Sequence, residues 1–99
     1  MNKSIQIKQI LAKIEIPKII PYLEANPQSK TLKKIVGYSQ RAWESEDPAE
    51  VFRLAVGAAY NLEAICDPNK AGYVKNESEK KYWLAISGEL FAATVGKKE

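Results

Sequence analysis

The side chains in this sequence that could carry chemistry are lysines, arginines, carboxylates and one cysteine, because histidine is absent. Histidine is the group best suited to proton transfer near neutral pH and the commonest metal ligand. Without it, Ser-His-Asp and Cys-His nucleophile systems are excluded, as is any zinc site with a histidine ligand. Cys66 alone cannot supply a cysteine-only zinc site, and its place at the end of an apolar stripe indicates a buried, unreactive thiol. We therefore expect no enzyme activity, no metal and no cofactor.

The acidic residues give no sign of an acid/base pair or of a calcium loop. Four carboxylates cluster around a predicted helix start, where negative charge suits the helix dipole: Glu44, Glu46, Asp47 and Glu50. The loop that begins at Asp67 has Gly72 at the position of the calcium-loop glycine, but Ser78 stands where a bidentate glutamate should close the cage. We expect an ordinary turn there.

Basic residues form the first candidate surface. Lys30, Lys33, Lys34 and Arg41 fall on one side of a helix predicted over residues 29–45. A row of cations beside an aromatic residue can follow a phosphate backbone, so this side is a candidate face for an anion or a nucleic acid. The alternative is a charged helix face that only meets solvent.

The segment from Thr31 to Trp43 resembles a helix-turn-helix DNA-binding motif. The likeness lies in a Leu-x-x-Ile run followed by Gly37-Tyr38-Ser39, where the glycine would turn the chain and the serine would cap a recognition helix. The segment departs from the motif because about three residues are missing between the apolar pair and the glycine, roughly one helical turn. The continuous amphipathic pattern of residues 32–43 favours one uninterrupted helix instead.

Length and composition indicate one globular domain over residues 1–99. A chain of 99 residues with 45% hydrophobic and 27% charged side chains has room for one core and is not of a disordered type. No apolar run approaches the roughly 18 residues that cross a bilayer, and the N-terminus has no signal-peptide core. Together with the single cysteine, this leads us to expect a cytoplasmic protein that does not enter membranes.

The apolar spacing is helical almost throughout. Residues 1–26 are predicted to form an N-terminal helix, which buries Ile7, Ile10, Leu11 and Ile14, and a short helix over residues 18–25 with Pro21 in its first turn. The β-branched content leaves a strand open as the alternative for residues 5–16. Residues 29–95 are predicted to form a three-helix core. Short connections between these helices favour antiparallel neighbours, so the expected fold is an all-α bundle of four to five helices.

Within that core, each helix has a predicted inner side. The helix over 29–45 is expected to bury Leu32, Ile35, Val36, Ser39 and Trp43. The helix that starts after Asp47, with Asp47 and Glu50 as a capping box, carries two apolar stripes and only a narrow polar strip around Arg53, Gly57 and Asn61, so it is expected to be central and buried. The last helix, over 77–95, is expected to bury Tyr82, Trp83, Ile86, Leu90 and Ala93.

The last helix also carries a second apolar stripe, which includes Leu84, Phe91 and Val95. Either this stripe stays uncovered and forms an interface, or the N-terminal helix closes over it. We therefore expect a non-enzymatic protein–protein interaction module, of a regulatory or adaptor kind, that forms a homo-oligomer through its C-terminal helices. Its partners would be a second copy of itself or another protein. The alternative is a small nucleic-acid-binding regulator that uses residues 29–45.

Overall fold

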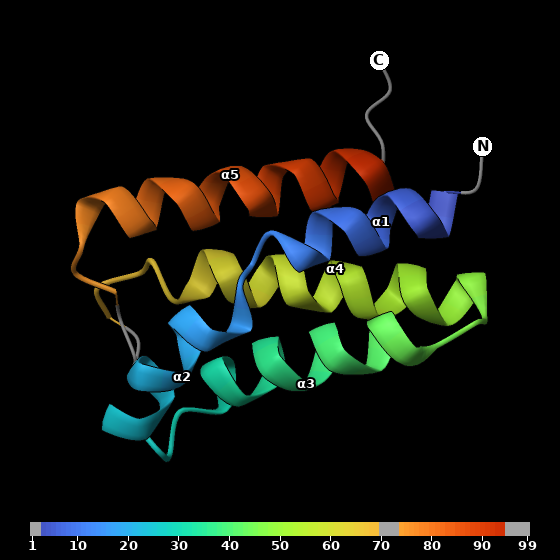
Figure 1. The fold of residues 1–99 in the computed structure, drawn as a ribbon. Helices are drawn as coiled ribbons and strands as arrows, with labels where there is room; N and C mark the ends of the chain where they lie inside the picture. Colours follow the sequence, from blue (N-terminus) through green and yellow to red (C-terminus); the bar gives the residue numbers. More distant parts are fainter. Residues whose placement is uncertain (1–2, 70–73, 95–99) are drawn as a thin grey trace.

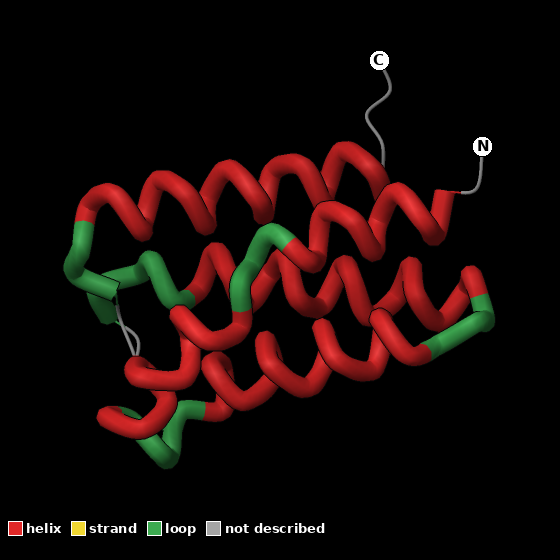
Figure 2. Tube along the Cα trace, in the orientation of Figure 1, coloured by secondary structure: helices red, strands yellow, loops and turns green. Residues whose placement is uncertain are grey.

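A computed structural model describes residues 3–69 and 74–94 of the chain. Its elements are α1 (Lys3–Ala12), α2 (Ile16–Ala25), α3 (Lys30–Glu44), α4 (Pro48–Ala64) and α5 (Glu77–Thr94). The described residues contain no strand, so the strand alternative for residues 5–16 is wrong: residues 5–12 lie in α1, and a bend over residues 13–15 leads into α2 (Figure 2). In Figure 1, α3, α4 and α5 run antiparallel in chain order, and α1 lies along α4 and α5. The predicted all-α bundle is confirmed.

The N-terminal helix packs as its spacing predicts. Ile7, Ile10, Leu11 and Ile14 are all buried in the same core cluster as the side chains of α3, α4 and α5. The chain then turns at Glu15, which has a left-handed backbone conformation with φ 57°. Only glycine adopts this region without a steric cost, so the bend between α1 and α2 is a strained one.

The second helix starts earlier than predicted. The amide of Lys18 donates to the carbonyl of Glu15 (2.7 Å), so the first turn contains Pro17, whose missing amide is not needed there. Pro21 consequently lies inside α2 and not in its first turn, which corrects the prediction. A proline inside a helix removes one backbone hydrogen bond and crowds the preceding turn, so α2 is a weak helix.

The third helix has the predicted limits, and it is continuous. The Ser29 side chain accepts a hydrogen bond from the amide of Leu32 (3.2 Å), which caps the first turn. Gly37 lies within the helix and Ser39 is buried in its middle, so neither the turn nor the serine cap of a helix-turn-helix motif is present. Trp43 was predicted to be buried, but its side chain is 55% exposed, and Ala42 points inward instead.

The fourth helix is central, as predicted, but it is not covered all round. Its buried side chains form one stripe: Val51, Leu54, Ala55, Ala58, Ala59 and Leu62. Phe52 and Tyr60 on its outer side are exposed, so the expectation of a helix buried on most sides is wrong. The reason is that α1, α3 and α5 together surround only part of its circumference.

The start of α4 is capped in a different way from the predicted capping box. The Asp47 side chain accepts from the amide of Ala49 (3.0 Å), as an N-cap should. Glu50 does not reach back to the Asp47 amide, which donates to the Ser45 hydroxyl (3.1 Å). That hydroxyl in turn donates to the Glu50 carboxylate (2.7 Å), so Ser45 mediates the contact.

Gly57 lies at a close approach of two helices, not on a polar strip. A Cβ atom at this position would be 2.6 Å from Cε2 of the Tyr38 ring of α3. The ring therefore packs directly on the backbone of α4, and this contact needs a residue without a side chain. The missing Cβ of Gly57, a residue expected on a polar strip, is thus part of the packing between α3 and α4.

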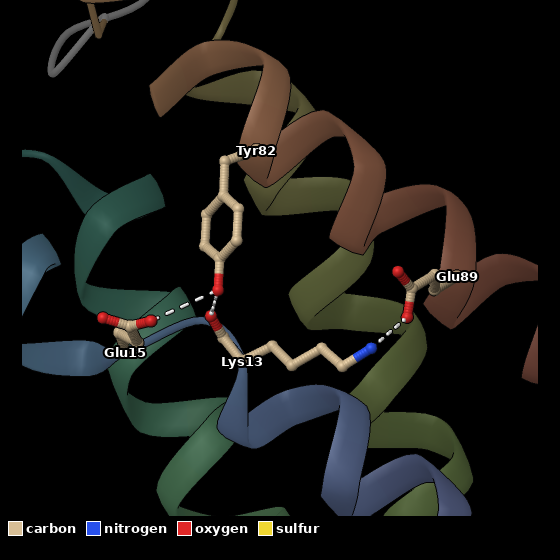
Figure 3. Close-up of polar contacts among 4 residues, drawn as sticks. All are labelled: Lys13, Glu15, Tyr82 and Glu89. Atoms are coloured by element: carbon tan, nitrogen blue, oxygen red, sulfur yellow. Dashed lines mark hydrogen bonds and ion pairs between the residues drawn. The ribbon is translucent and has the colours of Figure 1, made fainter. Parts of the chain in front are cut away.

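The last helix is fixed to α1 and α2 by polar contacts along one flank. Trp83 is fully buried, and its ring nitrogen donates to the carbonyl of Ile14 (3.3 Å). Tyr82, which was predicted to be buried, is partly exposed; its hydroxyl donates to the carbonyl of Lys13 (2.7 Å) and to the carboxylate of Glu15 (3.3 Å). Lys13 pairs with Glu89 (3.0 Å), as Figure 3 shows. These contacts hold the end of α1 against α5.

Candidate functional site

Large apolar side chains remain exposed on the outer flanks of α4 and α5. Phe52, Val56 and Tyr60 follow one another at four-residue spacing, so they share one side of α4. Leu84 and Phe91, seven residues apart, share one side of α5 for the same reason. Tyr60 is 61% and Leu84 41% exposed. We call these five residues the open α4/α5 face.

The two parts of this face meet through an aromatic pair. The rings of Tyr60 and Phe91 lie edge to face, with centroids 5.0 Å apart and planes inclined by 79°. Close by in the sequence, the buried hydroxyl of Ser87 donates to the carbonyl of Ala59 (2.9 Å), which fixes the two helices at this level. The aromatic pair is therefore already assembled in the single chain, with one ring half-buried and the other exposed.

The outcome differs for each of the three predicted interface residues. Leu84 is exposed, and Phe91 is half-buried against the core and against Tyr60. Val95 lies outside the described residues. The helix α1 does not close over Leu84, because it packs on the flank of α5 that carries Tyr82 and Glu89.

Three residues of the open α4/α5 face were missed by the sequence reasoning. Phe52 and Val56 belonged to the second of the two apolar stripes expected to be buried, and Tyr60 was assigned to no stripe. A signal was available, because Phe52, Val56 and Tyr60 continue at i, i+4 and i+8 on the side opposite the main stripe of α4. What the sequence did not give is whether a neighbouring helix covers that side.

The candidate basic face is exposed, and its residues divide into two groups. Lys30, Lys33 and Lys34 lie in the first turns of α3, and no ion pair joins them to a carboxylate of residues 3–69 or 74–94. Arg41, two turns later, approaches Glu50 of α4 (3.9 Å). Positive charge is unfavourable at the N-terminal end of a helix. The three lysines therefore add to a field that is already positive and favours anions.

The single cysteine is placed for structure more than for reactivity. Cys66 is half-buried just after α4, with its sulfur 3.5 Å from the carbonyl oxygen of Leu62 and 3.8 Å from that of Lys80. Burial raises the pKa of the thiol, Lys80 lowers it and Glu63 raises it, with a net upward shift. Because the thiolate is the reactive form, a raised pKa reduces the reactivity of Cys66 near neutral pH.

The part of the chain that the structure describes brings no three metal-ligating side chains together. None of its helices combines the length and the apolar character that a membrane crossing requires. In comparisons with known proteins, no family model matches the chain, and neither a curated protein nor a solved structure matches it.

Proposed function

We propose that this protein is a non-enzymatic interaction module, of a regulatory or adaptor kind, that self-associates through the open α4/α5 face. The observation that carries the proposal is the grouping of Phe52, Tyr60, Leu84 and Phe91 on adjoining helix flanks. Contiguous exposed apolar surface is uncommon on small monomers and marks interaction sites. Aromatic residues are also the side chains most enriched at the centres of interfaces.

A second copy of the chain is the occupant that we favour. Soluble oligomers are mostly symmetric dimers, in which one patch meets the same patch on the partner. Two flanks of antiparallel helices present parallel ridges, and these can pack against an identical pair as they do in a four-helix layer. A chain of 99 residues hides only about two-thirds of its unfolded surface, so burying this face would add stability that a domain of this size lacks.

The surroundings of the face fit the anatomy of an interface. Arg53 and Glu63 on α4 and Lys81 on α5 are exposed charged residues of the same two helices. A polar rim around an apolar centre is the usual arrangement at protein–protein contacts. A cytoplasmic location is part of the proposal and is supported by Cys66, an unpaired thiol of the kind that reducing compartments maintain.

The direct test is the oligomeric state, measured by sedimentation or light scattering over a range of protein concentrations. We expect a dimer for the wild type and a monomer for Leu84→Glu and for Tyr60→Glu, because each variant places a charge within the buried interface. Ile5→Glu is the matched control: Ile5 is 55% exposed on α1, away from the open α4/α5 face, so this variant should still dimerise. A wild type that stays monomeric at the highest concentration contradicts the proposal.

A second candidate function is binding of a nucleic acid or another polyanion by Lys30, Lys33 and Lys34. The observation that favours it is the absence of compensating carboxylates around these lysines among the described residues. Reversing two of the charges, in Lys33→Glu/Lys34→Glu, should abolish retention on nucleic acid at low salt, whereas the exposed Lys75→Glu should leave it unchanged. No retention of the wild type at low ionic strength removes this candidate.

A further inference from the structure

A cavity lies between the α1–α2 bend and the second half of α3, away from the open α4/α5 face. Its volume is about 410 Å³, within the range of roughly 300–1,000 Å³ that small-molecule sites occupy. Four residues at and beside the bend, from the end of α1 to the start of α2, line one side of it, and four residues of α3 line the other. They are Leu11, Ala12, Glu15 and Ile16, and Ser39, Gln40, Trp43 and Glu44.

One residue of this lining has an unsatisfied polar group. Ser39 is only 6% exposed, and its hydroxyl has no hydrogen-bond partner among the described residues. A serine within a helix commonly bonds to the carbonyl one turn earlier, but this one does not. A buried polar atom without a partner costs about 1–3 kcal/mol. The hydroxyl oxygen is closed to solvent as it stands, so a ligand in the cavity reaches it only after the Ser39 side chain rotates toward the opening; the hydrogen bond formed in this way would remove that cost.

Trp43 lines the same cavity with an indole that the fold leaves exposed. Leu11, Ala12 and Ile16 provide apolar surface opposite it. An exposed tryptophan beside an apolar wall can hold the hydrocarbon body of a ligand, and the face of its ring attracts cations more strongly than the rings of tyrosine and phenylalanine do. The tryptophan that the sequence pattern placed in the core is thus available for contacts outside it.

The charge of the lining is negative. Glu15 and Glu44 are its two ionisable residues, and it contains no basic side chain. The carboxylate of Glu15 is engaged with Lys18 (3.2 Å) and with the Tyr82 hydroxyl, as Figure 3 shows for the latter. Glu44 forms no ion pair with any described residue; the ammonium of Lys8 lies near this end of α3 but donates to the carbonyl of Ser45 (2.7 Å).

The wall of the cavity is held at the bend by contacts with α5 and α2. Glu15 has the left-handed backbone conformation at the bend, and a conformation of this kind persists only where the surroundings fix it. Those surroundings are Tyr82 of α5, which bonds both to Glu15 and to the carbonyl of Lys13, and Lys18 of α2. The cavity is therefore formed before any ligand binds, which reduces the cost of binding.

We propose that this cavity binds a small organic cation, namely a primary or secondary ammonium group on an apolar body. The body packs between Trp43 and the apolar wall made by Leu11 and Ile16. The ammonium group is neutralised by Glu44 and, once the Ser39 side chain has rotated toward the cavity, donates to its hydroxyl. This site is independent of the proposed self-association, because it shares no residue with the open α4/α5 face.

Tryptophan fluorescence gives a specific test. The chain has two tryptophans, and Trp83 is fully buried, so Trp43 is the one that reports on added ligands. The probe is benzylammonium, compared with benzyl alcohol and benzoate, which have the same ring and different charge. We expect a saturable change with benzylammonium, binding at least about tenfold weaker for benzyl alcohol, the factor that 1.4 kcal/mol corresponds to, and none for benzoate.

Variants of the lining complete the test. Glu44→Gln should weaken benzylammonium binding about tenfold or more, since it removes a charge-assisted contact, and Ser39→Ala should weaken it without loss of stability. Glu24→Gln is the matched control, because Glu24 is an exposed carboxylate of α2 outside the cavity. Trp43→Phe should abolish the fluorescence change while calorimetry still detects binding.

Three results overturn the proposal. The first is a wild type that shows no saturable response to benzylammonium by fluorescence or calorimetry. The second is an affinity for benzyl alcohol or benzoate equal to that for benzylammonium, since the charge would then play no part. The third is an effect of Glu24→Gln as large as that of Glu44→Gln, which would show a general loss of negative charge and no defined site.

Discussion

The two flanks of α5 differ in whether a neighbouring helix covers their apolar side chains. One flank is covered by α1, where the Trp83 ring is buried and Tyr82 and Glu89 form polar contacts with the end of α1 (Figure 3). The other flank carries Leu84 and Phe91 and is covered by no helix among the described residues beyond the contact of Phe91 with Tyr60. Both flanks are rich in apolar residues, so composition does not distinguish them.

What distinguishes the flanks is the presence of polar groups that fix a neighbour. On the covered flank, donors of α5 meet the carbonyls of Lys13 and Ile14, which lie in the turn that follows α1. These bonds are directional, and they define where α1 must lie. The open flank offers apolar side chains that form no hydrogen bond to a neighbouring helix. An apolar surface of this kind suits a contact formed between separate chains.

The largest difference between the flanks should appear in a matched pair of truncations in α5. Leu90 is fully buried, so Leu90→Ala should lower the free energy of unfolding by about 2–5 kcal/mol. Leu84→Ala should change it by no more than about 0.5 kcal/mol, because the exposed side chain leaves little cavity. Chemical denaturation at low protein concentration measures both. Equal losses would show that the open flank is covered.

Substitutions at two glycines compare a tightly packed contact between helices with an open helix surface. Gly57→Ala should destabilise the fold by about 1–3 kcal/mol, because the new Cβ would overlap the Tyr38 ring. Gly88→Ala, on the open flank of α5, has nothing within 4 Å of its Cβ and should stabilise the helix by up to about 1 kcal/mol. In a Tyr38→Ala background the effect of Gly57→Ala should become stabilising, and persistent destabilisation there would contradict the packing argument.

A side-chain hydrogen bond joins α2 to α5, because the Tyr22 hydroxyl donates to the carboxylate of Glu79. Tyr22→Phe should lower the free energy of unfolding by about 1 kcal/mol at neutral pH. The hydrogen bond to Glu79, together with burial and the negative charge of Glu79, raises the pKa of Tyr22 from 10.0 to about 12. Between these values the unfolded chain releases the proton while the folded chain keeps it, so the advantage of the wild type should shrink as pH rises from about 10 to about 12.

The check on that prediction is a series of denaturation curves of both proteins against pH, with a spectrophotometric titration of the tyrosines. Glu79→Gln should lower the pKa of Tyr22 towards its ordinary value, because the charge that opposes ionisation is gone. An advantage of the wild type that stays constant through the whole pH window would show that the hydroxyl does not interact with Glu79.

The smallest effect is expected from the ion pair on the covered flank. Lys13 and Glu89 are both exposed, so Lys13→Ala should cost no more than about 0.5 kcal/mol and less at high salt. Tyr82→Phe removes a hydrogen bond to a backbone carbonyl of the same region and should cost about 1 kcal/mol. If the ion pair proves the stronger of the two, charge and not the carbonyl contact positions α1.

The helices themselves were predictable, because capping residues and the apolar period mark where they begin and end. Ser29 and Asp47 cap the two central helices, and the apolar period of 3.6 residues marks their inner sides. The last inward position of α3 was not predictable from this period. Ala42 and not Trp43 faces the core, although Leu32, Ile35 and Ser39 are buried as predicted.

The surfaces were predictable only in part, for a different physical reason. Leu84 could be singled out from the period of α5 alone, but its exposure depends on where α1 packs. The cavity beside Trp43 could not be foreseen, since it joins Glu15 to Ser39, residues that are distant in sequence and meet only through tertiary packing. Neither Phe52 nor Tyr60 could be assigned to the surface before the neighbours of α4 were known.

The proline inside α2 has a consequence for the order in which the molecule opens. Pro21 leaves the carbonyl of Pro17 without its helical donor, and α2 packs mainly on α3. The amide protons of Lys18, Ile19, Ile20, Tyr22 and Leu23 should therefore exchange with deuterated solvent through partial unfolding events that leave α3, α4 and α5 intact. Local opening of α2 should cost less free energy than opening of α3, α4 or α5.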